Sequence, residues 1–469
     1  MKTTAQLTFE KVRHDEATDA HLVVSLTAPH RDSAAPRAPV CVVPVVDVSG
    51  SMSGAKLHFA KQSILKLIDH LAPGDAFGLV TFSSEVETLA PVEAMTPARK
   101  ESLKAVVGRL EAQANTNLAG GLLAGLAHAR DAQLPEGVVV RVILFTDGQA
   151  NAGPATSAED LERLLAANLG RATLSAFGYG RDPDQDLLRR LSDVGKGNYA
   201  YVGSPEDALT AFARELGGLL SAYAQGLEVR VTPREGAALT YVVSDVDARE
   251  ELGAVVIRMG ELLADEVRHL VLGVRLAPRA VPVHAPVAIA EVDVSWTYLD
   301  AGRPVKARAA CKATVRFVAP AEAQQKPTPS VDAVVAVAEL VRAQIEAEEA
   351  ARAGHFGEAR QVMRLFQAAV SERGHGAVGE TAAKLADGLG DADSYDRSRA
   401  YRSSMRKGST RSVASKLDDA AEQDLRAMGR SQGTAAQERM ERSFGAPAHP
   451  SSAGAPRRGR LERKRSSRW

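Results

Sequence analysis

The sequence predicts an α/β protein: a doubly wound, mostly parallel sheet inserted in or followed by a β-sandwich, then a helical hairpin and a disordered tail. Between residues 40 and 223, apolar strand-like runs alternate with amphipathic helices, and parallel neighbours need such crossover helices. Between residues 224 and 320 the helical period disappears and strand-like runs remain. The length of 469 residues allows about three domains.

Residues 1–39 are predicted to be the first strands of the sandwich plus a linker. Residues 7–26 contain β-branched runs that predict two edge strands, and the proline-containing residues 29–39 predict a loop. Because these strands precede the α/β domain and more strands follow it, the economical arrangement is one sandwich into which the α/β domain is inserted. Compact domains whose ends lie close together tolerate such an insertion.

Residues 40–223 are predicted to form the α/β domain. Its apolar runs are short enough for strands, whereas its longer segments have the spacing of amphipathic helices. Strands are expected at residues 40–47, 76–82, 85–89, 138–145, 172–178 and 198–202, and helices at 55–72, 97–109, 118–132, 157–169, 185–194 and 205–223.

The remaining chain is predicted to contain three further regions. Residues 224–320 form the rest of the sandwich, and residues 321–388 carry two amphipathic helices, 331–353 and 356–371, joined by a turn at Gly354. Residues 389–469 have low complexity and little apolar periodicity, and they end in a cluster of arginine and lysine. This basic tail is expected to be largely disordered.

Composition limits the classes of partner and compartment. Lys plus Arg and Asp plus Glu both number 58, so no nucleic-acid partner is expected from overall charge. The 2 cysteines, Cys41 and Cys311, lie in apolar runs and are interpreted as reduced thiols, with a structural disulfide as the alternative. Residues 1–8 lack the apolar core of a signal peptide, and no run reaches the roughly 18 apolar residues of a transmembrane segment. A cytoplasmic protein is therefore expected, while nothing in the sequence predicts its oligomeric state.

The segment with the clearest chemistry follows the strand at residues 40–47. Asp47, Ser49 and Ser51 alternate in the turn before the next helix, at the edge where open α/β sheets bind ligands. A carboxylate and hydroxyls suit a hard cation such as Mg²⁺. The alternative is purely structural, with Ser51 or Ser53 capping the helix that starts near Ala55.

The D-x-S-x-S pattern of these residues resembles the metal-ion-dependent adhesion site of von Willebrand factor type A (VWA) domains, and more distantly the chain is similar to their intracellular bacterial and plant RING-type branch. Thr116 and Asp147 match two further elements of that site. The resemblance implies that Asp47, Ser49, Ser51, Thr116 and Asp147 hold Mg²⁺, with Mn²⁺ or Ca²⁺ as alternatives. It also implies that one coordination position is left for an Asp or Glu of a partner protein.

Enzymatic patterns are absent from the sequence. It has no H-E-x-x-H pair and no G-x-x-x-x-G-K-[ST] phosphate loop, and the G-x-S-x-G pattern of hydrolases is broken at Met52. The expected function is therefore a non-enzymatic, metal-dependent protein-binding scaffold. Two alternatives remain: a metal-assisted hydrolase, and an adaptor that binds nucleic acid or membrane through the basic tail.

Deleting residues 456–469 is expected to leave the melting temperature unchanged, because Leu461 and Trp469 are the only residues of this segment able to bury much apolar area. Calorimetry of the full and shortened chains tests this expectation. A melting point several degrees lower in the shortened chain would show that the segment packs on the folded body.

Overall fold

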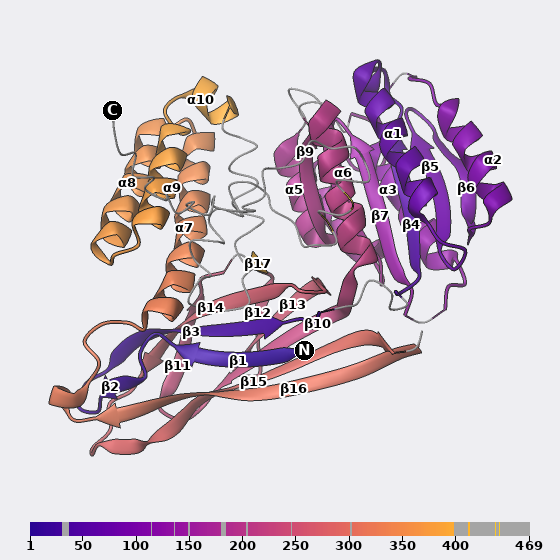
Figure 1. Cartoon of the computed structure of the whole chain (residues 1–469). Helices are drawn as coiled ribbons and strands as arrows, with labels where there is room; N and C mark the ends of the chain where they lie inside the picture. The colour runs from indigo at the N-terminus through magenta and orange to yellow at the C-terminus, as the bar shows by residue number, and fades with distance from the viewer. Residues whose placement is uncertain are drawn as a thin grey trace, which may run out of the picture.

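The computed structural model describes residues 1–30, 37–113, 115–135, 137–148, 151–179, 184–202, 205–244, 246–300, 303–397, 411–412, 437 and 440. In these residues the strands form three sheets, one in an α/β domain and two in a sandwich (Figure 1). The α/β domain and a group of helices stand on the same side of the sandwich (Figure 1). The predicted fold class is confirmed.

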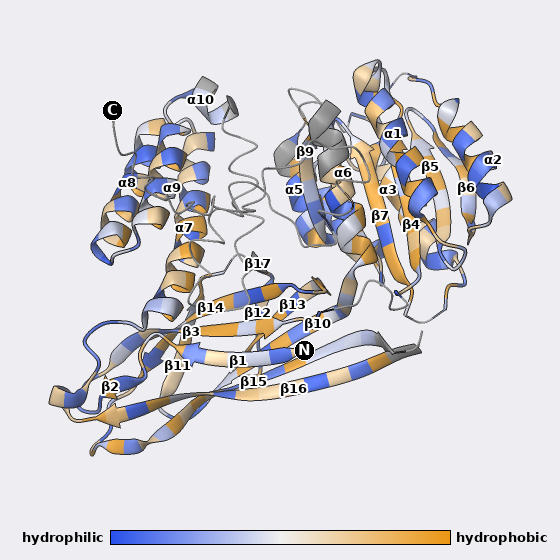
Figure 2. Cartoon of the chain, in the orientation of Figure 1, coloured by the Kyte–Doolittle hydropathy of each residue, from blue (hydrophilic) through white to orange (hydrophobic). Residues whose placement is uncertain are grey.

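The sheet of the α/β domain has the order β6-β5-β4-β7-β8-β9, and all neighbours are parallel except β5 and β6. The central strands are apolar and fully buried (Figure 2), because helices cover both faces. Helices α1, α2 and α6 pack on one face, and α3, α4 and α5 on the other. The strands are β4 (Val40–Asp47), β5 (Ala76–Phe82), β6 (Val86–Ala94), β7 (Val139–Thr146), β8 (Thr173–Tyr179) and β9 (Lys196–Val202), and the helices are α1 (Ala55–His70), α2 (Pro97–Gly108), α3 (Leu118–Asp131), α4 (Ala158–Asn168), α5 (Gln185–Val194) and α6 (Pro205–Leu220).

Two predicted boundaries in this domain were wrong by more than two residues. The strand expected at residues 85–89 extends to Ala94, since β6 is an edge strand that tolerates Pro91. The helix expected to reach residue 223 ends at Leu220, because Ala222 already pairs with Leu263 in the sandwich.

The sandwich combines strands from before and after the α/β domain. One sheet has the order β1-β3-β14-β11, and the other β12-β13-β10-β15-β16-β2. Of the two edge strands predicted in residues 7–26, β2 does lie at the edge of its sheet, but the prediction was wrong for β3. Strand β3 lies inside its sheet between β1 and β14, and β1 was missed because its residues are mostly polar. The strands are β1 (Lys2–Leu7), β2 (Lys11–Arg13), β3 (Thr18–Thr27), β10 (Ala222–Pro233), β11 (Ala237–Val242), β12 (Ala248–Glu251), β13 (Ala254–Leu263), β14 (Val267–Leu276), β15 (Val283–Asp300) and β16 (Arg303–Val318).

The predicted helical hairpin has a third helix. Helices α7 (Pro329–Arg352) and α8 (Phe356–Glu372) are followed by α9 (Gly376–Asp387), and the three share one apolar core. The predicted disordered tail, residues 389–469, lies mostly outside the described residues. Its described parts include helix α10 (Ala392–Arg397) and strand β17 (Arg411–Ser412), which pairs with β14.

Two expectations about composition can be compared with the described residues. Cys41 in β4 and Cys311 in β16 are both free thiols, as the sequence predicted. No helix in the described part of the chain is long and apolar enough to cross a membrane.

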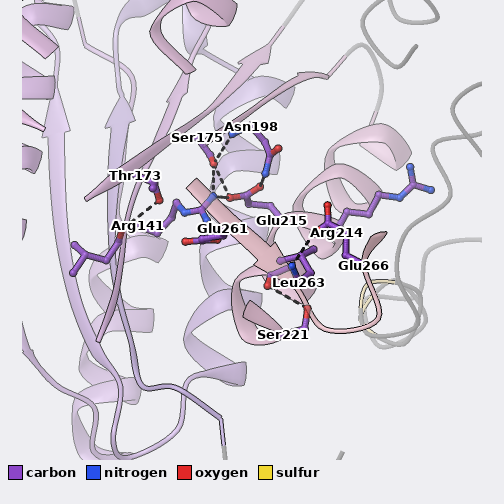
Figure 3. A network of polar contacts seen from close by, with 12 residues as sticks. Arg141, Thr173, Ser175, Asn198, Arg214, Glu215, Ser221, Glu261, Leu263 and Glu266 are labelled. Carbon is purple, nitrogen blue, oxygen red and sulfur yellow. Dashed lines mark hydrogen bonds and ion pairs between the residues drawn. The ribbon is translucent and has the colours of Figure 1, made fainter. Parts of the chain in front are cut away.

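A buried ion-pair network joins the α/β domain to the sandwich (Figure 3). The guanidinium of Arg141, on β7, pairs with Glu215 of α6 and lies 2.5 Å from Glu261 Oε2 of β13. Arg141 also donates to Ser175 Oγ at 2.8 Å. Burial acts to lower the pKa of Arg141, but Glu261 and Glu215 outweigh it and the pKa is raised. Arg141 therefore remains protonated and positively charged in the folded protein.

Replacing Arg141 by Met is expected to destabilise the protein by about 3–5 kcal/mol, because it leaves the buried carboxylate of Glu215 and the nearly buried one of Glu261 without their shared cation. Urea unfolding measures this change in free energy. The exposed Arg130, replaced in the same way, is the control and should have an effect near zero. Equal stability of the Arg141→Met variant and the wild type would show that this network does not stabilise the folded protein.

Candidate metal centre

Two neighbouring parallel strands bring the two predicted carboxylates together. Asp47 is the last residue of β4, and Asp147 directly follows β7. These strands pair in register, with Val46 opposite Phe145, so the residues that follow lie side by side at the carboxyl edge of the sheet. Both side chains are withdrawn from solvent, since Asp47 is 0% and Asp147 3% exposed.

Asp47 is held firmly by its neighbours. Its Oδ1 accepts a hydrogen bond from Ser49 N at 2.8 Å, and its Oδ2 accepts one from Thr146 Oγ1 at 2.6 Å. Burial raises the pKa of Asp47, the hydrogen bonds from Ser49 and Thr146 oppose this rise, and the charge of Asp147 adds to it. Neither of the two groups that donate these hydrogen bonds to Asp47 carries a charge.

The hydroxyls of Ser49 and Ser51 are available to a ligand. Their Oγ atoms lie 3.1 Å apart; Ser49 is the N-cap of the short helix η1 (Gly50–Met52), and Ser51 is its middle residue. Neither Ser51 nor Ser53 caps α1, since its N-cap is Gly54, with a positive φ of 76° and no side-chain hydrogen bond. The alternative interpretation of these serines as helix caps was therefore wrong.

Thr116 lies in a loop that is fastened to the same edge of the sheet. Gln113 N donates to Val48 O at 2.5 Å, just after β4, and Asn117 N donates to Ser83 O at 2.7 Å, just after β5. The backbone of Thr116 is also bonded to Asn151, whose Oδ1 accepts from Thr116 N at 2.9 Å. Thr116, 2% exposed, is thus fixed between the loop after β4 and the loop after β7.

Close packing of α3 on the sheet supports this placement. At Gly125 a Cβ atom would come within 2.3 Å of Val45 Cγ2 on β4. Only glycine allows this approach without a shift of the helix or the strand. Thr116 lies two residues before the start of α3. The close packing of α3 on β4 therefore also fixes the position of the loop that contains Thr116.

Asp147 has one satisfied and one unsatisfied oxygen. Its Oδ2 accepts from Lys56 Nζ at 2.9 Å, whereas its Oδ1 is buried with no hydrogen-bond partner in the described residues. A buried carboxylate oxygen without a partner is costly, and a bound cation would remove this cost. The residues present therefore fit a divalent metal ion.

Three residues of this site were not predicted from the sequence. Thr146 orients Asp47, Asn151 orients the Thr116 loop, and Lys56 pairs with Asp147. The position of Lys56 could have been noticed in the sequence, because a positive charge in the first turn of a helix is unfavourable to the helix dipole and indicates another role. Thr146 and Asn151 flank Asp147 in the sequence but have no pattern of their own.

The family model of the von Willebrand factor type A domain matches residues 42–215. Among curated proteins, inter-alpha-trypsin inhibitor heavy chain H4 of Bos taurus is 31% identical over 161 residues, which is 33% of this chain and 17% of that protein. Heavy chain H1 of Mesocricetus auratus is 34% identical over 171 residues, which is 35% of this chain and 18% of that protein. The match thus spans less than a fifth of either relative.

Two solved structures share the fold over most of the chain. A von Willebrand factor type A protein from Catenulispora acidiphila has a TM-score of 0.64 and 21% identity, and the match covers 82% of this chain and 89% of that one. The ArnB paralog VWA2 from Sulfolobus acidocaldarius has a TM-score of 0.55 and 17% identity, with coverage of 86% and 98%. The strand order, the family match and these structures agree, and residues 42–215 are therefore a von Willebrand factor type A domain.

Proposed function

We propose that this protein is a non-enzymatic binding scaffold whose VWA domain holds a divalent cation and presents it to an Asp or Glu of a protein partner. The cation is Mg²⁺, with Mn²⁺ or Ca²⁺ as alternatives, and its ligands are Asp47, Ser49, Ser51, Thr116 and Asp147. The observation that carries the proposal is the pair of buried carboxylates, one with an unpartnered oxygen, beside two serine hydroxyls that cap no helix.

The charge of the ligand set explains why a partner would be needed. Two carboxylates at most neutralise a divalent ion, and the serine and threonine hydroxyls add no charge. Oxygen ligands in small number leave Mg²⁺ with coordination positions that water or a further carboxylate fills. A partner's Asp or Glu is the natural ligand for such a position, because its negative charge gains more there than a neutral amide does.

Two further observations bear on the choice of the metal site and on the cellular location. No group of three or more His, Cys, Asp or Glu residues that could hold a metal occurs in the described part of the chain, so the hydroxyl-rich site is the one on which we base the function. Cys41 and Cys311 lie on strands of different domains as free thiols, which agrees with the cytoplasmic location that we propose.

Replacing Asp47 by Ala is expected to abolish Mg²⁺ binding while leaving the fold intact, since Asp47 lies at the end of its strand and its buried charge is not compensated without metal. Isothermal titration calorimetry measures the binding, and circular dichroism checks the fold. Asp131→Ala, which removes an exposed carboxylate at the end of α3, is the matched control. Unchanged Mg²⁺ affinity in the Asp47→Ala variant would disprove the assignment.

Partner recognition can be tested with peptides that differ at one position, which is Asp, Glu, Asn or Gln in a randomised background. With Mg²⁺ present, the immobilised protein is expected to enrich Asp and Glu peptides over their amides. The enrichment should vanish with a chelator and in the Asp47→Ala variant. Equal retention of acids and amides, or enrichment that survives chelation, would contradict capture of a carboxylate by the metal.

A further inference from the structure

Lys56 occupies an unusual place in the VWA domain. It is the second residue of α1, whose first turn contains no acidic residue, although the amino-terminal end of a helix favours negative charge. Its ammonium instead reaches Asp147, with Nζ 2.9 Å from Oδ2. The Lys56 side chain is 32% exposed and that of Asp147 only 4%. The lysine side chain is therefore partly exposed to solvent while its ammonium contacts a buried carboxylate.

The contacts of the two carboxylates show what Lys56 contributes. Asp47 is bonded to the Ser49 amide and the Thr146 hydroxyl, neither of which is charged. Asp147 is bonded to Lys56, and its other oxygen has no partner in the described residues. In the described contacts, Lys56 is thus the cation that pairs with Asp147, and no cation is bonded to Asp47. Lys56 pairs with one oxygen of the carboxylate whose other oxygen the proposed metal would take.

We propose that Lys56 is a displaceable internal counter-ion that competes with the divalent cation for Asp147. This inference rests on the proposed metal-binding function. Without metal, the ammonium stabilises the buried carboxylate of Asp147. When metal enters, it displaces the ammonium from Asp147 Oδ2 or shares the carboxylate with it, so part of its binding free energy is used to break the ion pair. The long, one-third exposed side chain can turn to solvent without any movement of the backbone.

Two consequences follow for the chain's own residues. Lys56 lowers the affinity of the site for metal, because the ammonium both shares the carboxylate of a proposed ligand, Asp147, and repels the incoming cation. It also protects the metal-free protein, because it compensates a charge that would otherwise be buried alone. Removing the ammonium must therefore move metal affinity and metal-free stability in opposite directions, whereas a general defect of the fold would lower both.

The test compares Lys56→Met, which keeps the length of the side chain, with Lys56→Arg, which keeps the charge. At 150 mM salt, titration calorimetry with Mg²⁺ is expected to give a dissociation constant at least about tenfold lower for Lys56→Met than for wild type. In a chelator, the same variant should melt at a lower temperature. Lys56→Arg should remain close to wild type in both measurements.

Lys61→Met is the matched control, since it removes a cation from the same helix whose Nζ bonds to Leu110 O at 2.6 Å. Its Mg²⁺ affinity should equal that of wild type. If wild type and Lys56→Met bind Mg²⁺ equally, the metal site stands and the counter-ion role of Lys56 is overturned. If Lys56→Met alone binds, Lys56 permanently replaces the metal, which supports the role of Lys56 and overturns metal-dependent function in the natural chain. If neither binds, both proposals fail.

Discussion

The parallel pairing of β4 with β7 is the constraint on which the candidate site depends. Each strand is fully buried, and their register sets Val46 opposite Phe145. The next residues of each strand, Asp47 and Thr146, must then meet at the carboxyl edge, where Thr146 Oγ1 donates to Asp47. A slip of one residue would move these side chains to opposite faces of the sheet. The register of the apolar core therefore also sets the geometry of the polar site.

The same pairing creates an electrostatic problem. It places two carboxylates side by side with almost no solvent, and burial together with the neighbouring charge raises the pKa of Asp47. Hydrogen bonds from Ser49 and Thr146 relieve only one of the two groups. Buried carboxylates are costly without a compensating positive charge, and Lys56 supplies one to Asp147. In the proposed function a divalent ion would supply another, so the affinity for metal would be the difference in free energy between the lysine-paired and the metal-bound site.

The sequence predicted most of the α/β domain but only part of the site. The missed residues interact with partners that lie far away in the sequence. Asp47, Ser49 and Ser51 lie within one short segment, so their spacing was visible. Lys56 escaped because its partner Asp147 is 91 residues away. Arg141 escaped because it is a charged residue in an otherwise apolar strand, and its partner Glu261 lies in the sandwich. Helix α9, which has glycine at positions 376 and 379 in its first turn, and the polar strand β1 were missed because their local propensities are weak and tertiary packing stabilises them.

Strand β7 connects the site to the sandwich. It carries Arg141 near one end and leads to Asp147 at the other, and Arg141 is anchored to Glu261 of β13 and to Glu215 of α6. Any movement of α6 or of the sandwich relative to β7 must separate buried ion pairs, which is costly in a low-dielectric interior. The described contacts therefore favour an α/β domain that is held rigidly against the sandwich. In the function proposed above, a partner that binds the metal would meet a preorganised site, and its binding free energy would not be used to deform the protein.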